Sequence, residues 1–192
     1  MNLKKMYWNI VENKNQKLSY WQILDYYKIK HDLRSYVHDN WVNWHNLNRE
    51  SAIIKMLRRS KIQLLCQLEL FMDYNFQHPN YSQPVATIQE FEKFLESNIT
   101  LYRGGKWEYD PKTYYQNKRF VSFTISEDRV NTFSKYSGSF AMQTYKLPEN
   151  NRYWQVKLII KPKDILLYFD VQDQEAIVSV EDALKATLIK QT

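Results

Sequence analysis

Hydrophobic and polar positions follow two different spacings along this chain. Up to about residue 97, apolar residues recur at three- and four-residue steps, which is the spacing of one helix face. Beyond it, short runs rich in β-branched and aromatic residues are separated by polar or turn residues. The pattern therefore predicts an α+β protein, in which an N-terminal helical region is followed by a mainly antiparallel β-sheet.

The first part is expected to hold helices over residues 19–30, 51–74 and 88–97. Residues 51–74 are predicted as one long helix, because neither Gly nor Pro interrupts their apolar spacing. Thr87 and Glu90 have the spacing of a capping box at the start of the last helix. We expect residues 1–86 to be a helical extension and residues 87–192 the core, together forming one compact unit.

The second part is expected to hold five strands and one helix. The strands are predicted at 99–102, 119–125, 153–160, 164–169 and 176–180. A helix over 127–137 follows the second strand, with Ser126 as its N-cap.

Composition and charge narrow the classes of partner and compartment. The single cysteine, Cys66, allows no disulfide within the chain and fits the reducing cytoplasm of a producing or target cell. We expect no secretory leader, no membrane span and no membrane partner. The net charge of +6 is spread evenly over both halves. Solvated surface charge is the simplest interpretation, and an anionic cofactor or nucleic acid is the alternative.

Three histidines in the first part recur at seven-residue steps. These are His31, His38 and His45. Pairs of metal-binding histidines on a helix stand three or four residues apart, so we interpret these three as structural and expect no metal site.

Three short motifs in the β-rich part carry side chains suited to chemistry. The first is Tyr102-Arg103-Gly104, an arginine near the end of a hydrophobic strand. The second is Ser122-Phe123-Thr124, where strand alternation predicts Ser122, Thr124 and Ser126 on one face and Val121, Phe123 and Ile125 toward the core. The third is Asp173-Gln174-Glu175, which places two carboxylates on one side of a strand entrance.

In this order, the motifs resemble those of ADP-ribosyltransferases of the arginine–serine–glutamate type. That family is marked by an aromatic-Arg pair, a Ser-x-Ser/Thr motif, and a Glu or Gln two residues before a Glu. The resemblance covers residues 99–180, including a helix after the second motif and two strands before the third. It implies the fold of that family and NAD⁺ as co-substrate.

The resemblance also implies roles for individual residues. Arg103, with Tyr102 beside it, would bind the NAD⁺ phosphates, and Gly104 would leave room for the nicotinamide amide. Glu175 would stabilise the positive charge that develops on the ribose. Ser122 would orient Glu175, and Thr124 would support the site from the same face. Phe133 would pack against the nicotinamide or, as the simpler interpretation, in the core.

Asp173 departs from the family pattern, because its side chain is one methylene shorter than the usual Glu or Gln. In the family, that longer side chain reaches the acceptor and, when acidic, can deprotonate it. The departure leaves the class of acceptor open.

Several functions stay open at this point. The leading hypothesis is a mono-ADP-ribosyltransferase that modifies a protein side chain or a nucleic acid, like the small enzymes that serve as bacterial toxins, phage-encoded modifiers or defence effectors. An inactive module that binds NAD⁺ or RNA is one alternative, and an NAD⁺ glycohydrolase is another. The N-terminal helices would shape the acceptor side, or bind the target or an antitoxin or other inhibitor protein.

Overall fold

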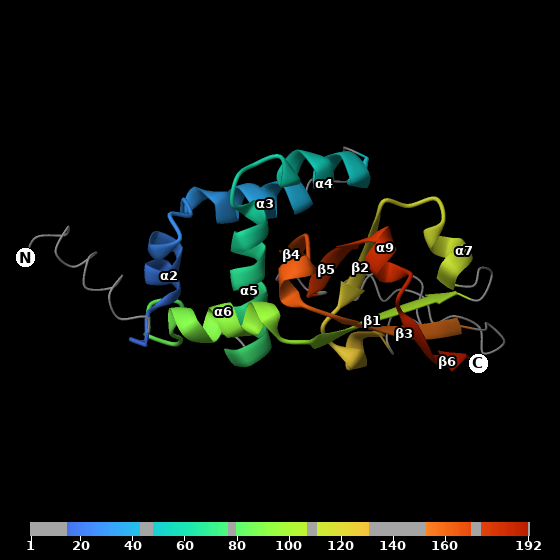
Figure 1. The fold of residues 1–192 in the computed structure, drawn as a ribbon. Helices are drawn as coiled ribbons and strands as arrows, with labels where there is room; N and C mark the ends of the chain where they lie inside the picture. Colours follow the sequence, from blue (N-terminus) through green and yellow to red (C-terminus); the bar gives the residue numbers. More distant parts are fainter. Residues whose placement is uncertain are drawn as a thin grey trace, which may run out of the picture. The chain divides into compact units, whose positions relative to one another are not determined.

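The computed structural model describes residues 15–42, 48–76, 80–106, 111–130, 153–169 and 174–191. The chain divides into two compact units, Met1–Ser97 and Asn98–Thr192. The first is helical and the second is built on a six-stranded antiparallel sheet (Figure 1). The α+β class is therefore confirmed.

The first unit is organised around one buried helix. Its helices are α2 Tyr20–Tyr26, α3 Asp32–Val42, α4 Arg49–Leu57, α5 Ile62–Phe76 and α6 Ile88–Glu96. Helix α5 packs against α3, α4 and α6, and every residue over 65–73 is buried. A helix that is buried on all sides serves as the core of its unit.

The prediction of one continuous helix over 51–74 is wrong, because α4 and α5 are separate. Helix α4 ends at its C-cap Arg58, and Lys61 has a left-handed φ of 68° just before α5. Residues 58–61 are all polar, so this turn offers no apolar side chain to a helical core face. The chain turns at residues 58–61 although this segment contains neither Gly nor Pro.

Helix α6 belongs to the first unit. The predicted capping box is confirmed, since Thr87 Oγ1 accepts from the Glu90 N–H at 3.0 Å and Glu90 Oε2 accepts from the Thr87 N–H at 2.7 Å. The rings of Phe91 and Phe94 pack on Phe71 of α5 with centroids 5.4 and 5.2 Å apart. These contacts place the boundary at 97/98, whereas we expected it at 86/87.

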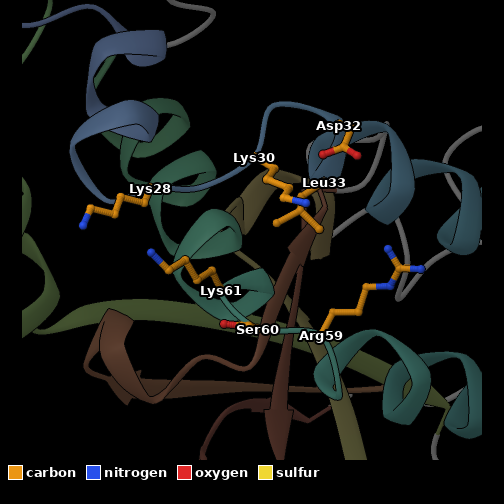
Figure 2. A pocket seen from close by; sticks show the side chains of 7 residues that line it. All are labelled: Lys28, Lys30, Asp32, Leu33, Arg59, Ser60 and Lys61. Carbon is orange, nitrogen blue, oxygen red and sulfur yellow. The ribbon is translucent and has the colours of Figure 1, made fainter. Parts of the chain in front are cut away.

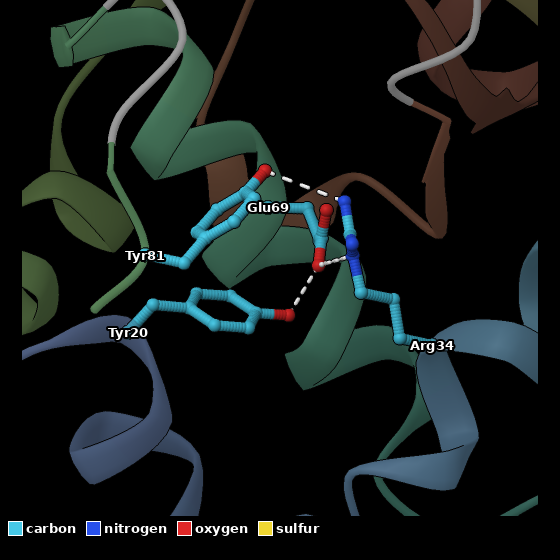
Figure 3. A network of polar contacts seen from close by, with 4 residues as sticks. All are labelled: Tyr20, Arg34, Glu69 and Tyr81. Carbon is cyan, nitrogen blue, oxygen red and sulfur yellow. Dashed lines mark hydrogen bonds and ion pairs between the residues drawn. The ribbon is translucent and has the colours of Figure 1, made fainter.

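A buried carboxylate on α5 forms hydrogen bonds with side chains of α2 and α3 (Figure 3). Glu69 on α5, whose side chain is 9% exposed, accepts a hydrogen bond from the Tyr20 hydroxyl and another from Arg34 Nε at 3.0 Å. Arg34 Nη2 also donates to the Tyr81 hydroxyl at 3.4 Å, and the guanidinium lies over the Tyr81 ring. Because buried charges need hydrogen-bonding partners, this network fixes α2 and α3 against α5.

We expect Glu69→Gln to lower the free energy of unfolding of the first unit by about 1.5–3 kcal/mol, the range for charged hydrogen bonds. The amide keeps the shape of the carboxylate, and its oxygen can still accept from Tyr20 and Arg34, but the negative charge that strengthens these hydrogen bonds is lost. Tyr20→Phe, which removes one hydroxyl, is expected to cost about 1 kcal/mol. Urea denaturation of both variants measures these changes, and equal stability of Glu69→Gln and the native chain would show that the network is dispensable.

In its described residues, the second unit contains all five predicted strands and four elements that were not predicted. Its strands are β1 Ile99–Lys106, β2 Phe120–Thr124, β3 Tyr153–Ile160, β4 Leu167–Phe169, β5 Glu175–Ser179 and β6 Thr187–Gln191. The unpredicted elements are the helices α7 Pro111–Tyr115 and α9 Val180–Ala183, the 3-10 helix η3 Pro162–Asp164 and strand β6. The strand order is β4-β5-β2-β1-β3-β6, so the strands of the three motifs, β1, β2 and β5, are neighbours.

Pairing between β1 and β2 is limited to a single register pair, Tyr102 with Thr124. Beyond that pair, residues 103–106 continue to pair with β3, and residues 120–123 continue to pair with β5. The sheet therefore opens between residues 103–106 of β1 and residues 120–123 of β2. We call this opening the fork.

Candidate active site

The side chain of Arg103 bridges the fork. Its Nη1 donates to the backbone oxygen of Ser122 and, at 2.8 Å, to the Ser122 hydroxyl. These hydrogen bonds connect β1 and β2 at a point where the two backbones no longer pair with each other. The structure thus brings together the arginine of the first motif and the serine of the second.

Tyr114 is a third member of the site, and sequence reasoning missed it. It lies on α7, within the connection between the two arms of the fork, and its hydroxyl accepts a hydrogen bond from Arg103 Nη2 at 3.1 Å. The available signal was Pro111, a residue favoured at the first position of a helix. A helix of five residues is too short to show apolar periodicity, so the sequence pattern predicts no element there.

The site has an excess of positive charge. All hydrogen bonds of the Arg103 guanidinium to the described residues go to uncharged oxygens, and its buried Nε has no partner among those residues. The ammonium of Lys118 lies 4.5 Å from the centre of the Tyr114 ring and adds a second cation. An anion with several oxygen atoms would complement this arrangement.

The two tyrosines of α7 have opposite pKa shifts. Burial raises the pKa of Tyr114, but the charges of Arg103 and Lys118 outweigh it and bring that pKa below its ordinary value. For Tyr115, which is buried against Trp154, burial dominates and raises the pKa to about 12. Tyr114 is therefore the tyrosine of this pair that more readily carries negative charge.

We expect the Tyr114 hydroxyl to lose its proton at a lower pH than that of Tyr115. Titration of ring carbon signals by NMR measures both values, with Tyr114→Phe and Tyr115→Phe to assign them. In Arg103→Gln the pKa of Tyr114 is expected to rise, because one cation is lost while the burial remains. An unchanged Tyr114 titration in that variant would show that Arg103 does not interact with the phenol in solution.

Glu175 lies at the start of β5, one strand from Ser122. It pairs with Thr124 of β2 and with Phe169 of β4, while Ser122 pairs with Ile177. Since residues two apart on a strand share a face, Glu175 and Ser122 are diagonal neighbours on one face, with a typical Cα separation of about 7–8 Å. Glu175 is half-buried, and Gln174 before it has a left-handed φ of 47°. Sparsely populated backbone conformations of this kind gather at functional sites.

Thr124 links the first and third motifs. It pairs with Tyr102 on one side and Glu175 on the other, so these three residues form a row across β1, β2 and β5. Ile125 was expected toward the core but is half-exposed, whereas Thr124, expected on the face of Ser122, is buried. The reason is that β2 ends at Thr124, whose hydroxyl accepts the Ser126 N–H at 3.2 Å in the turn into the next helix. The predicted burial of Val121 and Phe123 is confirmed.

The two glycines after Arg103 lie on β1, paired with β3. Gly104 pairs with Gln155 and Gly105 with Trp154. A Cβ on Gly105 would lie 2.2 Å from Cζ2 of the Trp154 indole, so only glycine fits against this ring. Trp154 in turn packs against Tyr114 and Tyr115. Gly105 therefore supports the position of α7 at the fork.

Two residues proposed for the site, Asp173 and Phe133, lie outside the described residues. The predicted N-cap Ser126 does begin a helix, whose residues 127–130 are described. Within the described ranges, no three His, Cys, Asp or Glu side chains gather in a way that could hold a metal ion. No helix in those same ranges is long and apolar enough to span a bilayer.

Comparisons with known proteins add no family to this description. The chain matches no protein-family model, no curated protein and no solved structure.

Proposed function

We propose that the unit Asn98–Thr192 is an ADP-ribosyltransferase core, which cleaves NAD⁺ and transfers ADP-ribose to a macromolecular acceptor. The observation that supports this proposal best is the placement of Arg103, Ser122 and Glu175 on three adjacent strands around the fork. The motifs are far apart in the sequence, and nothing in each motif alone requires them to meet.

The charge of the fork suits the pyrophosphate of NAD⁺. Arg103 is held by Ser122 and Tyr114, both uncharged, so its positive charge is not neutralised by a carboxylate of the described residues. A phosphate oxygen that reached the buried Nε would satisfy a donor that has no partner among the described residues. Lys118, an exposed residue whose ammonium lies near the Tyr114 ring, would contact the same anion through water or directly.

Glu175 is the proposed catalytic carboxylate. As the bond between ribose C1′ and the nicotinamide nitrogen breaks, its electron pair leaves with neutral nicotinamide and positive charge develops on the ribose. A carboxylate beside the ribose lowers the energy of that state. A nucleophilic atom of the acceptor then bonds to C1′ and loses its proton.

Ser122 is the proposed positioning residue for Glu175. Its hydroxyl is within hydrogen-bond distance of Arg103 and lies on the same face as Glu175, one strand away. A hydroxyl can accept from Arg103 and donate to a carboxylate at the same time. Asp173 is proposed as the base that receives the acceptor's proton, and its short side chain requires an acceptor held close to the strand.

Labelled NAD⁺ tests the proposed function. The full chain is incubated with NAD⁺ labelled in the adenylate part and with cell extracts, and the products are divided by protease and by nuclease treatment. We expect labelled macromolecules, whose sensitivity to protease or nuclease identifies the acceptor class. Free ADP-ribose as the main product would indicate a glycohydrolase, and NAD⁺ that binds but stays intact would indicate an inactive binding module.

A further inference from the structure

The first unit contains an open pocket lined by four cationic side chains. Its volume is about 340 Å³, and it lies between the turn that follows α2 and the turn that joins α4 to α5 (Figure 2). Lys28 and Lys30 come from the first turn, and Arg59 and Lys61 come from the second. Asp32 is the only acidic residue of its lining, so the pocket has a net positive charge.

Lys28 occupies a backbone position that favours glycine. Its φ is 53°, and the N–H groups of Lys28 and Ile29 donate to the carbonyls of Asp25 and Leu24. This is the helix ending whose left-handed residue is usually Gly and sometimes Asn. The backbone conformation therefore does not favour lysine at this position. The reason for a lysine here must lie in its charged side chain.

Lysine is also a disfavoured residue at position 61, for two local reasons. Its φ is 68°, and it immediately precedes the N-terminus of α5. The positive end of a helix dipole disfavours a cation there, and Ser, Thr, Asp or Asn is the usual residue. The ammonium donates one hydrogen bond to the Tyr27 carbonyl, which leaves two of its three donors for other partners. Of the three non-glycine residues with left-handed φ in the described ranges, two are these lysines.

The charges of the pocket are not neutralised within the described residues. None of the four cations forms an ion pair with Asp or Glu there, and Arg59 instead lies over the Tyr36 ring at 3.7 Å. The helices α3 and α5 both begin at the pocket, so their N-terminal dipoles add to its positive potential. An anion bound here would relieve repulsion among all these groups.

We propose that this pocket binds the phosphate backbone of a nucleic acid. All four cations are exposed, so the pocket is too open to surround a small anion. A single phosphate bound there would keep most of its hydrating water. Strong binding to such an open site requires a chain of phosphates that contacts several cations at once and releases their counterions. Binding at this site is independent of the transfer reaction proposed for the second unit.

The test measures binding of the full chain to a fluorescein-labelled single-stranded RNA of mixed sequence by fluorescence anisotropy. The pocket variant combines Lys28→Asn, Lys30→Gln, Arg59→Gln and Lys61→Asn. Asparagine tolerates a left-handed backbone, so the two turns are expected to keep their conformations. The control variant removes the same charge from exposed lysines elsewhere: Lys17→Gln, Lys93→Gln, Lys157→Gln and Lys163→Gln.

We expect the pocket variant to bind at least about tenfold more weakly at about 0.1 M salt, and the control variant to bind within about threefold of the native chain. The slope of log affinity against log salt is expected to fall by about 0.7 for each phosphate that the pocket variant no longer neutralises. Equal weakening in the two variants would overturn the proposal in favour of general surface charge. Displacement of the RNA by polyglutamate, or by ATP or inorganic phosphate at equal charge, would show that the pocket does not select a phosphate backbone.

Discussion

Glu175→Gln is expected to lower the rate of NAD⁺ cleavage by at least about 100-fold, the range observed when one charge-stabilising group is removed from an active site. Glutamine has nearly the same shape but cannot neutralise the positive charge that develops on the ribose. The half-buried side chain lies at the strand entrance, so the fold is expected to remain intact. Because Arg103 is unchanged, NAD⁺ is expected to bind within about threefold of its native affinity.

The effect is measured as release of nicotinamide by chromatography, with calorimetric titration of NAD⁺ alongside. Glu181→Gln on α9 is the matched control, since it removes the same charge from an exposed position of the same unit. If Glu175→Gln keeps more than about a third of the native rate, Glu175 is not the catalytic carboxylate. Loss of NAD⁺ binding together with activity would instead assign the residue to substrate binding.

Gly105→Ala is expected to lower the free energy of unfolding of the second unit by about 3 kcal/mol, the upper end of the usual cost of overpacking. The new Cβ would lie 2.2 Å from Cζ2 of Trp154 and less than 3 Å from two further indole atoms. Trp154 is only 2% exposed, so its ring has no free space into which it can move. The backbone of β1 must therefore shift, and α7 with it.

Thermal or urea denaturation measures this loss, and a double-mutant cycle identifies its cause. The alanine is expected to cost much less in a Trp154→Leu background, because the smaller side chain removes the clash. A loss of the same size in both backgrounds would contradict the close approach of Gly105 and Trp154. A shift of α7 is also expected to raise the pKa of Tyr114, because the phenol would move away from Arg103.

The strands and caps could be predicted because their signals are local. The alternation of Val121 and Phe123 with polar residues indicated the register of β2, and the Thr87–Glu90 spacing indicated the start of α6. The helix break at Lys61 could not be predicted by the same reasoning. It depends on a left-handed lysine, and the usual markers of such a conformation, Gly and Asn, are absent from residues 58–61.

The candidate site could be predicted only in part, because its geometry depends on contacts between distant segments. The motifs indicated Arg103, Ser122 and Glu175, and the sheet order then made their strands neighbours. Neither the fork nor Tyr114 follows from any motif, since one results from an interrupted ladder and the other from a five-residue helix. The basic pocket has the same origin: Lys28 and Arg59 are brought together by the packing of helices rather than by a run of charge.

Release of nicotinamide from NAD⁺ by the purified chain, with and without cell extract, tests the central claim most directly. We expect release that follows the amount of native chain, is accompanied by labelled macromolecules when extract is present, and is nearly abolished by Glu175→Gln. An absence of nicotinamide release across several extracts, in a chain whose folding is confirmed by cooperative unfolding, would contradict the assignment of the fork as an NAD⁺-cleaving site.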